Sequence, residues 1–105
     1  SALLERVYRL QGKPTSEALT DQELVKLLEE YLVHWMMGDD KQGIELLLGN
    51  RTFLESAFPH WGQVAAFVRG EIAAAKYRRL REPQQGKNAF LPLFLFEDAL
   101  KVVAG

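Results

Sequence analysis

Residues 20–38, TDQELVKLLEEYLVHWMMG, are the stretch that decides the fold. Thr20 and Glu23 have the spacing of a capping box, in which each side chain accepts a hydrogen bond from the other residue's backbone amide at the start of a helix. Apolar residues then recur every three or four positions, as on one face of a helix, and Gly38 is placed to end it. These apolar residues are Leu24, Leu27, Leu28, Tyr31, Leu32, Trp35 and Met36. The stretch predicts an amphipathic helix.

Two short helices are predicted after Gly38. Asp39 or Asp40 has the side chain to cap the first of them, and Gly49 and Asn50 close it. Asn50 or Thr52 can then start one or two further turns that run toward Phe58. In the first of these helices the residues expected to face inward are Ile44, Leu47 and Leu48.

The sequence also predicts a first helix and a long helix. Apolar spacing favours a helix over residues 2–11, which Gly12 ends. A long helix is predicted from Pro59, whose missing amide costs nothing in a first turn, to about Arg81. Its apolar pattern includes Trp61, Val64, Ala65, Phe67, Val68, Ile72, Ala75, Tyr77 and Leu80.

The C-terminal region contains a loop signal followed by an apolar run. Residues 82–88, EPQQGKN, hold no apolar residue and predict a loop. Pro92 suits a first helical turn, so we expect a helix from there to about Val103. Residues 90–96 fit a strand as the alternative.

Together these elements predict an all-α protein, an irregular small bundle of about five to six helices joined by short connections. At 105 residues the chain has the size of one domain, so we expect a single helical domain over residues 1–105. Because the chain starts at Ser1 without a methionine, we also expect it to be a piece of a larger protein. The longest apolar run, residues 89–96, is too short to span a membrane.

Charge is unevenly distributed, although the net charge is only −1. Residues 17–55 hold nine acidic and three basic residues, whereas residues 69–87 hold six basic and two acidic residues. Such a division can steer a charged partner. It can equally bring the two halves of the chain together inside one fold.

Catalytic and metal-binding groups are sparse, so we expect no enzyme activity, no cofactor and no metal site. The chain has no cysteine, which excludes thiolate chemistry and gives a reducing, cytoplasmic location as the default expectation. His34 and His60 do not have the spacing of a metal motif. Ser56 lies four residues before His60, but Pro59 interrupts the helical geometry. Glu29 and Glu30 are interpreted as a solvated flank.

The apolar run in residues 90–96 motivates the main functional hypothesis, a protein-protein interaction or adaptor domain. These residues would cover every side of a helix, so either other elements of the bundle wrap them or a partner covers them. The partner would be another protein, the rest of the same chain or a second copy. The predicted apolar contacts are Phe90, Leu93, Phe94 and Phe96.

The alternative hypothesis is a nucleic-acid-binding domain that uses the basic end of the long helix, residues 76–87. Cations in a last helical turn are also favoured by the helix dipole alone. Tyr77 fits the buried stripe of that helix. The residues predicted as a charged rim, or as phosphate contacts, are Arg69, Lys76, Arg78, Arg79, Arg81 and Lys87.

Overall fold

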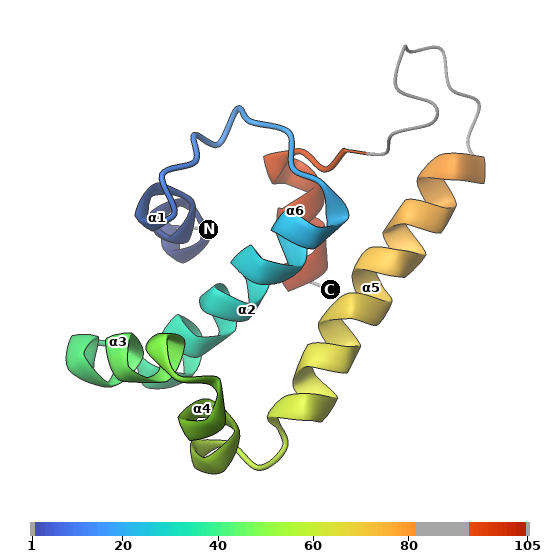
Figure 1. Cartoon of the computed structure of the whole chain (residues 1–105). Helices are drawn as coiled ribbons and strands as arrows, with labels where there is room; N and C mark the ends of the chain where they lie inside the picture. Colours follow the sequence, from blue (N-terminus) through green and yellow to red (C-terminus); the bar gives the residue numbers. More distant parts are fainter. Residues whose placement is uncertain (1, 82–92, 105) are drawn as a thin grey trace.

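The computed structural model describes residues 2–81 and 93–104, and over these residues the chain forms six helices and no strand (Figure 1). The prediction of an all-α small helical bundle is confirmed. In chain order the helices are α1 (Ala2–Leu10), α2 (Asp21–Met37), α3 (Lys41–Gly49), α4 (Arg51–Ala57), α5 (Trp61–Arg81) and α6 (Phe96–Ala104). None of the described helices is both long and apolar enough to cross a membrane.

The capping box predicted for α2 is present. Thr20 Oγ1 accepts a hydrogen bond from the Glu23 amide at 3.2 Å, and Glu23 Oε1 accepts one from the Thr20 amide at 3.0 Å. At the other end Gly38 takes a φ of +64°, which glycine adopts at little cost, and its amide donates to the His34 carbonyl. Both ends of α2 are therefore set by local sequence.

The helices α3 and α4 are also capped locally. Asp40, rather than Asp39, caps α3 by accepting from the Gly43 amide at 2.9 Å. Asn50, rather than Thr52, caps α4 by accepting from the Phe53 amide at 3.1 Å. Asn50 thus ends one helix and begins the next, so α3 and α4 form a tight helical pair.

The predicted start of α6 at Pro92 is wrong, because residues 93–95 are not helical. Phe94 instead forms an isolated antiparallel bridge with Leu19, with the two amides donating to the opposite carbonyls at 2.7 and 2.8 Å. α6 begins only at Phe96, where Asp98 accepts a hydrogen bond from the Leu95 amide at 2.8 Å. The strand alternative is also not met, since one bridge is all that forms in the described residues.

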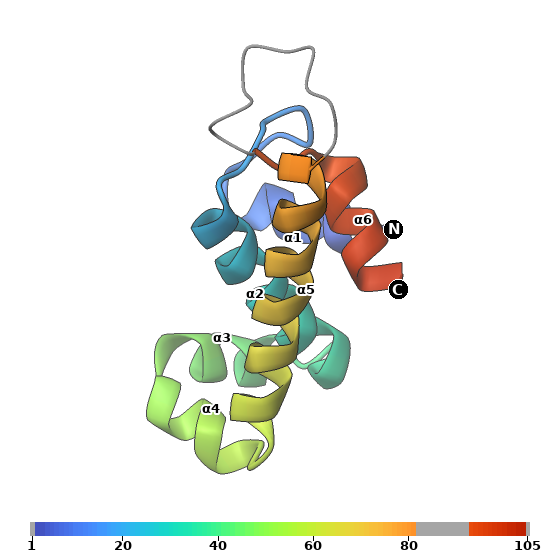
Figure 2. The ribbon, with the colours of Figure 1, turned by 90° about the vertical axis from the view of Figure 1, so that its right-hand side faces the viewer.

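The core has two clusters that the long helices α2 and α5 join. The first packs α1, α2, α5 and α6 together around Leu4, Val7, Tyr8, Leu19, Leu24, Leu27, Leu28, Val68, Ile72, Phe94 and Ala99. The second packs α2, α3, α4 and α5 around Val33, Ile44, Leu47, Leu54, Trp61 and Ala65. Figure 2 shows α3 and α4 at one end of α5, with α1 and α6 toward the other.

Candidate functional site

Of the four predicted apolar contacts in residues 90–96, the three that the structure describes are buried or partly buried. Phe94 was predicted as a surface contact, but it is fully buried in the first cluster and therefore belongs to the core. Phe96 is partly buried and packs edge-on against Tyr8, with ring centroids 5.2 Å apart. Leu93 is also partly buried, while Leu95 is exposed. Phe90 lies outside the described residues.

Two of the predicted basic residues pair with carboxylates of α2. Lys76 Nζ lies 3.2 Å from Asp21 Oδ2, and this hydrogen bond holds the pKa of Asp21 below its ordinary value. Arg69 Nη2 lies 3.9 Å from Glu29 Oε2. The uneven charge along the chain is therefore neutralised in part between α2 and α5.

The other predicted basic residues lie at the end of α5 or follow it in the sequence. Arg78 is exposed and shares a hollow between α5 and α6 with Glu71, Glu97, Asp98 and Lys101. Tyr77, which the pattern assigned to the core, is exposed instead. The side chains of Arg79 and Arg81, together with Lys87, lie outside the described part of the chain.

Besides Tyr77, two further large aromatic side chains that the sequence assigned to buried stripes are open to solvent. Trp35 on α2 is 68% exposed and Phe67 on α5 is 62% exposed. Trp35 follows Tyr31 by four residues and so continues the apolar face of α2, but α6 lies beside the earlier part of that helix (Figure 1). Phe67 directly precedes the buried Val68 and therefore points about 100° away from it.

The helices that carry these two side chains, α2 and α5, pack against each other, and we call the two exposed aromatic residues together the Trp35–Phe67 surface. Val102, near the end of α6, lines the same hollow as Glu71, and Phe67 lies one turn before Glu71 on α5. Phe67 therefore lies one turn beyond the α5 residues that line this hollow with α6. The periodicity of α2 and α5 shows which side chains share a face, but not how far a neighbouring helix extends along that face. Among the residues whose side chains the structure describes, the other exposed large apolar ones are Leu10, Leu46, Leu48, Phe53, Tyr77 and Leu95.

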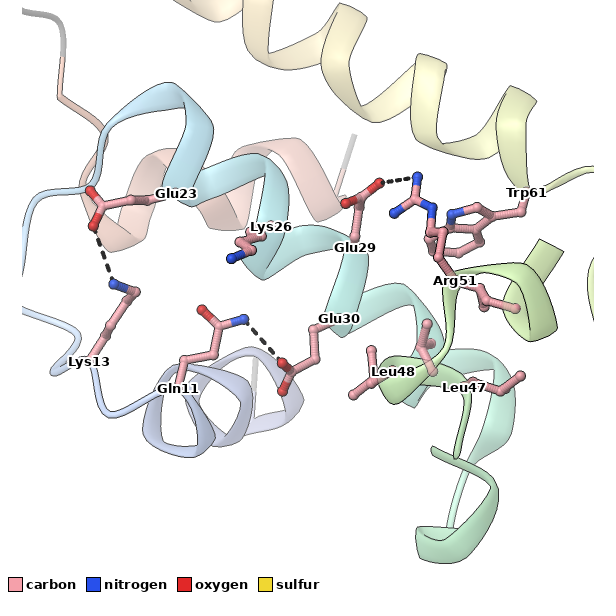
Figure 3. A pocket seen from close by; sticks show the side chains of 12 residues that line it. Gln11, Lys13, Glu23, Lys26, Glu29, Glu30, Leu47, Leu48, Arg51 and Trp61 are labelled. Carbon is pink, nitrogen blue, oxygen red and sulfur yellow. Dashed lines mark hydrogen bonds and ion pairs between the residues drawn. The ribbon is translucent and has the colours of Figure 1, made fainter. Parts of the chain in front are cut away.

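A groove lies between α1 and α3, with α2 as its floor (Figure 3). It consists of two adjoining hollows of about 660 and 430 Å³ that share Glu30 and Leu48. Leu48 was predicted to face inward, but it is exposed at the edge of the groove. The first hollow is also lined by Gln11, Lys13, Glu23, Lys26, Glu29, Val33, Leu47, Arg51, Leu54 and Trp61.

The interpretation of Glu29 and Glu30 as a solvated flank is wrong. Their side chains are only 13% and 19% exposed, because α1 and α4 pack on either side of this part of α2. Glu29 Oε2 lies 3.6 Å from Arg51 Nη2, in addition to its pairing with Arg69, and so links α2 to α4 and α5. Glu30 faces Gln11 of the segment after α1.

The two histidines lie in different environments. His34 is buried, with its Nε2 3.6 Å from Glu30 Oε2, whereas His60 is exposed before α5. Among residues 2–81 and 93–104, no three His, Asp or Glu side chains gather as they would around a metal ion. The groove contains paired charges, a buried imidazole and apolar walls.

No protein-family model, curated protein or solved structure matches this chain.

Proposed function

We propose that this chain is a helical protein-interaction or adaptor domain without catalytic activity of its own. The observation that supports this proposal is the Trp35–Phe67 surface. Large aromatic residues dominate binding energy at protein interfaces, since they bury much apolar area with little loss of conformational freedom. Trp35 is not an isolated exposed residue, because it continues the same face of α2 that α6 covers elsewhere.

The partner in this proposal is another protein, a further part of the same chain or a second copy. Polar and charged residues on the neighbouring turns, such as Gln63 and Glu71, would form the rim of the contact. A cytoplasmic location is the setting we propose for it, as the absence of cysteine favours.

The test compares the wild-type protein with the double variant Trp35→Ser, Phe67→Ser. Because both side chains are exposed, we expect the variant to keep its helix content and its unfolding midpoint. Proteins retained by the wild type from an extract of the source organism are identified, purified and bound again. The double variant should bind such a partner at least about tenfold more weakly.

Tyr77→Ser is the matched control, since Tyr77 is exposed to a similar degree but lies near the opposite end of α5. It should leave the affinity unchanged. A purified partner that binds the wild type and the Trp35, Phe67 double variant equally well would exclude this surface as the contact.

Nucleic-acid binding is the second candidate, which the exposed Arg78 at the end of α5 favours. It has less support than the sequence alone suggested, because Lys76 and Arg69 already face carboxylates of α2. Fluorescence anisotropy with mixed-sequence DNA and RNA at two salt concentrations tests it. Binding that falls steeply with salt and disappears in Arg78→Glu, Arg79→Glu would support phosphate contacts. Binding that changes neither with salt nor in this double variant would exclude the basic end of α5 as a nucleic-acid contact.

A further inference from the structure

We infer that the groove between α1 and α3 is a recognition site for a basic side chain, arginine or lysine, presented by a partner polypeptide. This inference rests on the proposed interaction function and names a second contact beside the Trp35–Phe67 surface. It is carried by the position of Glu30, the balance of charge around it and two apolar residues at the groove edges.

Glu30 provides the acceptor at the centre of the groove, since it lines both hollows. Its Oε1 accepts a hydrogen bond from Gln11 Nε2 at 3.1 Å, and Figure 3 shows this amide reaching the carboxylate from across the opening. Its Oε2 lies 3.6 Å from His34 Nε2, which is too long for a hydrogen bond. One oxygen of a largely buried carboxylate thus has acceptor capacity left.

The charge around Glu30 favours a cation in the smaller hollow. That hollow is lined by three carboxylates, from Glu30, Asp39 and Glu45, and by two basic side chains. The two basic residues are Arg6 and Lys41, and neither forms an ion pair with another described residue. An incoming positive charge would make this lining neutral.

The larger hollow does not compete for that cation. It contains equal numbers of carboxylates and basic side chains. Lys13 lies 3.3 Å from Glu23 and Arg51 lies 3.6 Å from Glu29, so two of its three cations already have acidic neighbours. The net negative charge is therefore local to the Glu30 end.

Leu10 and Leu48 explain why a long basic side chain fits better than a free cation. They come from α1 and α3, on the two sides of the floor, and both line the smaller hollow while 60% and 42% exposed. An arginine or lysine has an aliphatic stem that would pack between the two leucines while its charged head reaches Glu30. A guanidinium would add a charge-assisted hydrogen bond to Oε2.

The test uses the acetylated, amidated tripeptides Leu-Arg-Leu and Leu-Gln-Leu as probes, with binding followed by amide chemical shifts of the isotope-labelled protein. We expect the arginine probe to bind about tenfold more tightly than the glutamine probe. The shifts should concentrate at Leu10, Glu30, His34 and Leu48. Glu30→Gln should remove this preference while keeping the size of the side chain.

Glu97→Gln is the matched control, because it removes the same charge from an exposed position on α6, outside both hollows of the groove. It should leave binding of the arginine probe unchanged. Leu48→Ser tests the stem contact separately and should weaken both probes, so the inference stays testable if Glu30→Gln fails to fold. Equal binding of the two probes, shifts centred elsewhere, or an unchanged affinity in Glu30→Gln would overturn the inference. Those results would leave the Trp35–Phe67 proposal intact, since its test uses other residues.

Discussion

The hydroxyl group of Tyr8 is a polar atom inside the first apolar cluster. It is buried and has no hydrogen-bond partner among the described residues. Burial raises the pKa of Tyr8, and the nearby carboxylates of Asp98 and Glu17 raise it further. The neutral phenol is thus the form that this site stabilises.

Tyr8→Phe should therefore keep the free energy of unfolding or increase it by up to about 1 kcal/mol, because it removes a hydroxyl group whose burial is uncompensated. Tyr8→Ala, which also removes the ring that packs on Phe96, should cost about 3–5 kcal/mol. Urea unfolding followed by circular dichroism measures both changes. A loss above about 1 kcal/mol in Tyr8→Phe would reveal a hydrogen bond to the hydroxyl.

Gly43 and Gly70 are both helical glycines, but alanine should have opposite effects at the two positions. A Cβ at Gly43 would collide with the carboxylate of Asp40 and with Met37, and so would disturb the cap of α3. A Cβ at Gly70 would meet no atom within 4 Å.

Gly70→Ala should stabilise the protein by about 0.5–1 kcal/mol, because alanine loses less conformational entropy in a helix. Gly43→Ala should instead lower the free energy of unfolding by about 1 kcal/mol, the usual loss when a cap is removed. Parallel thermal unfolding of the two variants checks the signs. Stabilisation by Gly43→Ala would show that Asp40 can move without losing its cap.

At the scale of elements, the helices that could be predicted are those whose ends depend on nearby residues. The capping box of α2, Asp40 before α3 and Asn50 before α4 act within three or four positions, so their signals are visible in the sequence. The start of α6 could not be predicted in the same way. Phe94 is held extended by Leu19, and that pairing joins segments far apart in the chain.

Two carboxylates near the start of α2 make the stability of the fold depend on pH. The pKa of Asp21 is lowered, chiefly by the hydrogen bond from Lys76, and that of Glu23 is lowered by the amide of Thr20. Because the folded pKa values lie below the unfolded ones, these groups add stability that is fully present above about pH 4 to 5 and is lost as the pH falls through the folded values.

Lys76→Gln should raise the pKa of Asp21 toward its ordinary value. Protonation of Asp21 at low pH should then cost the folded protein less stability than it does in the wild type. The loss of stability at neutral pH should be small, below about 1 kcal/mol, because both side chains are exposed to solvent. Carboxyl chemical shifts followed through a pH titration measure the pKa directly. An unchanged Asp21 pKa in the variant would contradict the pairing, with the pKa of Glu23 as the internal reference.

At the scale of the whole molecule, the sequence left open whether the apolar run in residues 90–96 is core or interface, and the structure places its Phe94 in the core. Periodicity shows which side chains share a face of a helix, and it put Trp35 with Leu28 and Phe67 with Val68. It does not show how far along that face another helix extends. Burial of Phe94 depends on its pairing with Leu19, and exposure of Trp35 depends on which elements pack on α2; both are properties of the assembled fold.

The two tryptophans make this arrangement measurable, because Trp35 is 68% exposed and Trp61 only 1%. In Trp61→Phe the remaining fluorescence comes from Trp35, and it should show the emission of a hydrated indole and strong quenching by acrylamide. In Trp35→Phe the emission of Trp61 should lie at shorter wavelength and resist quenching. Circular dichroism verifies that each variant keeps its helices.

If Trp35 is quenched in dilute protein and becomes protected as the concentration rises, a second copy covers the Trp35–Phe67 surface. Protection at every concentration would instead contradict the exposed position of Trp35 and remove the basis for placing the contact there.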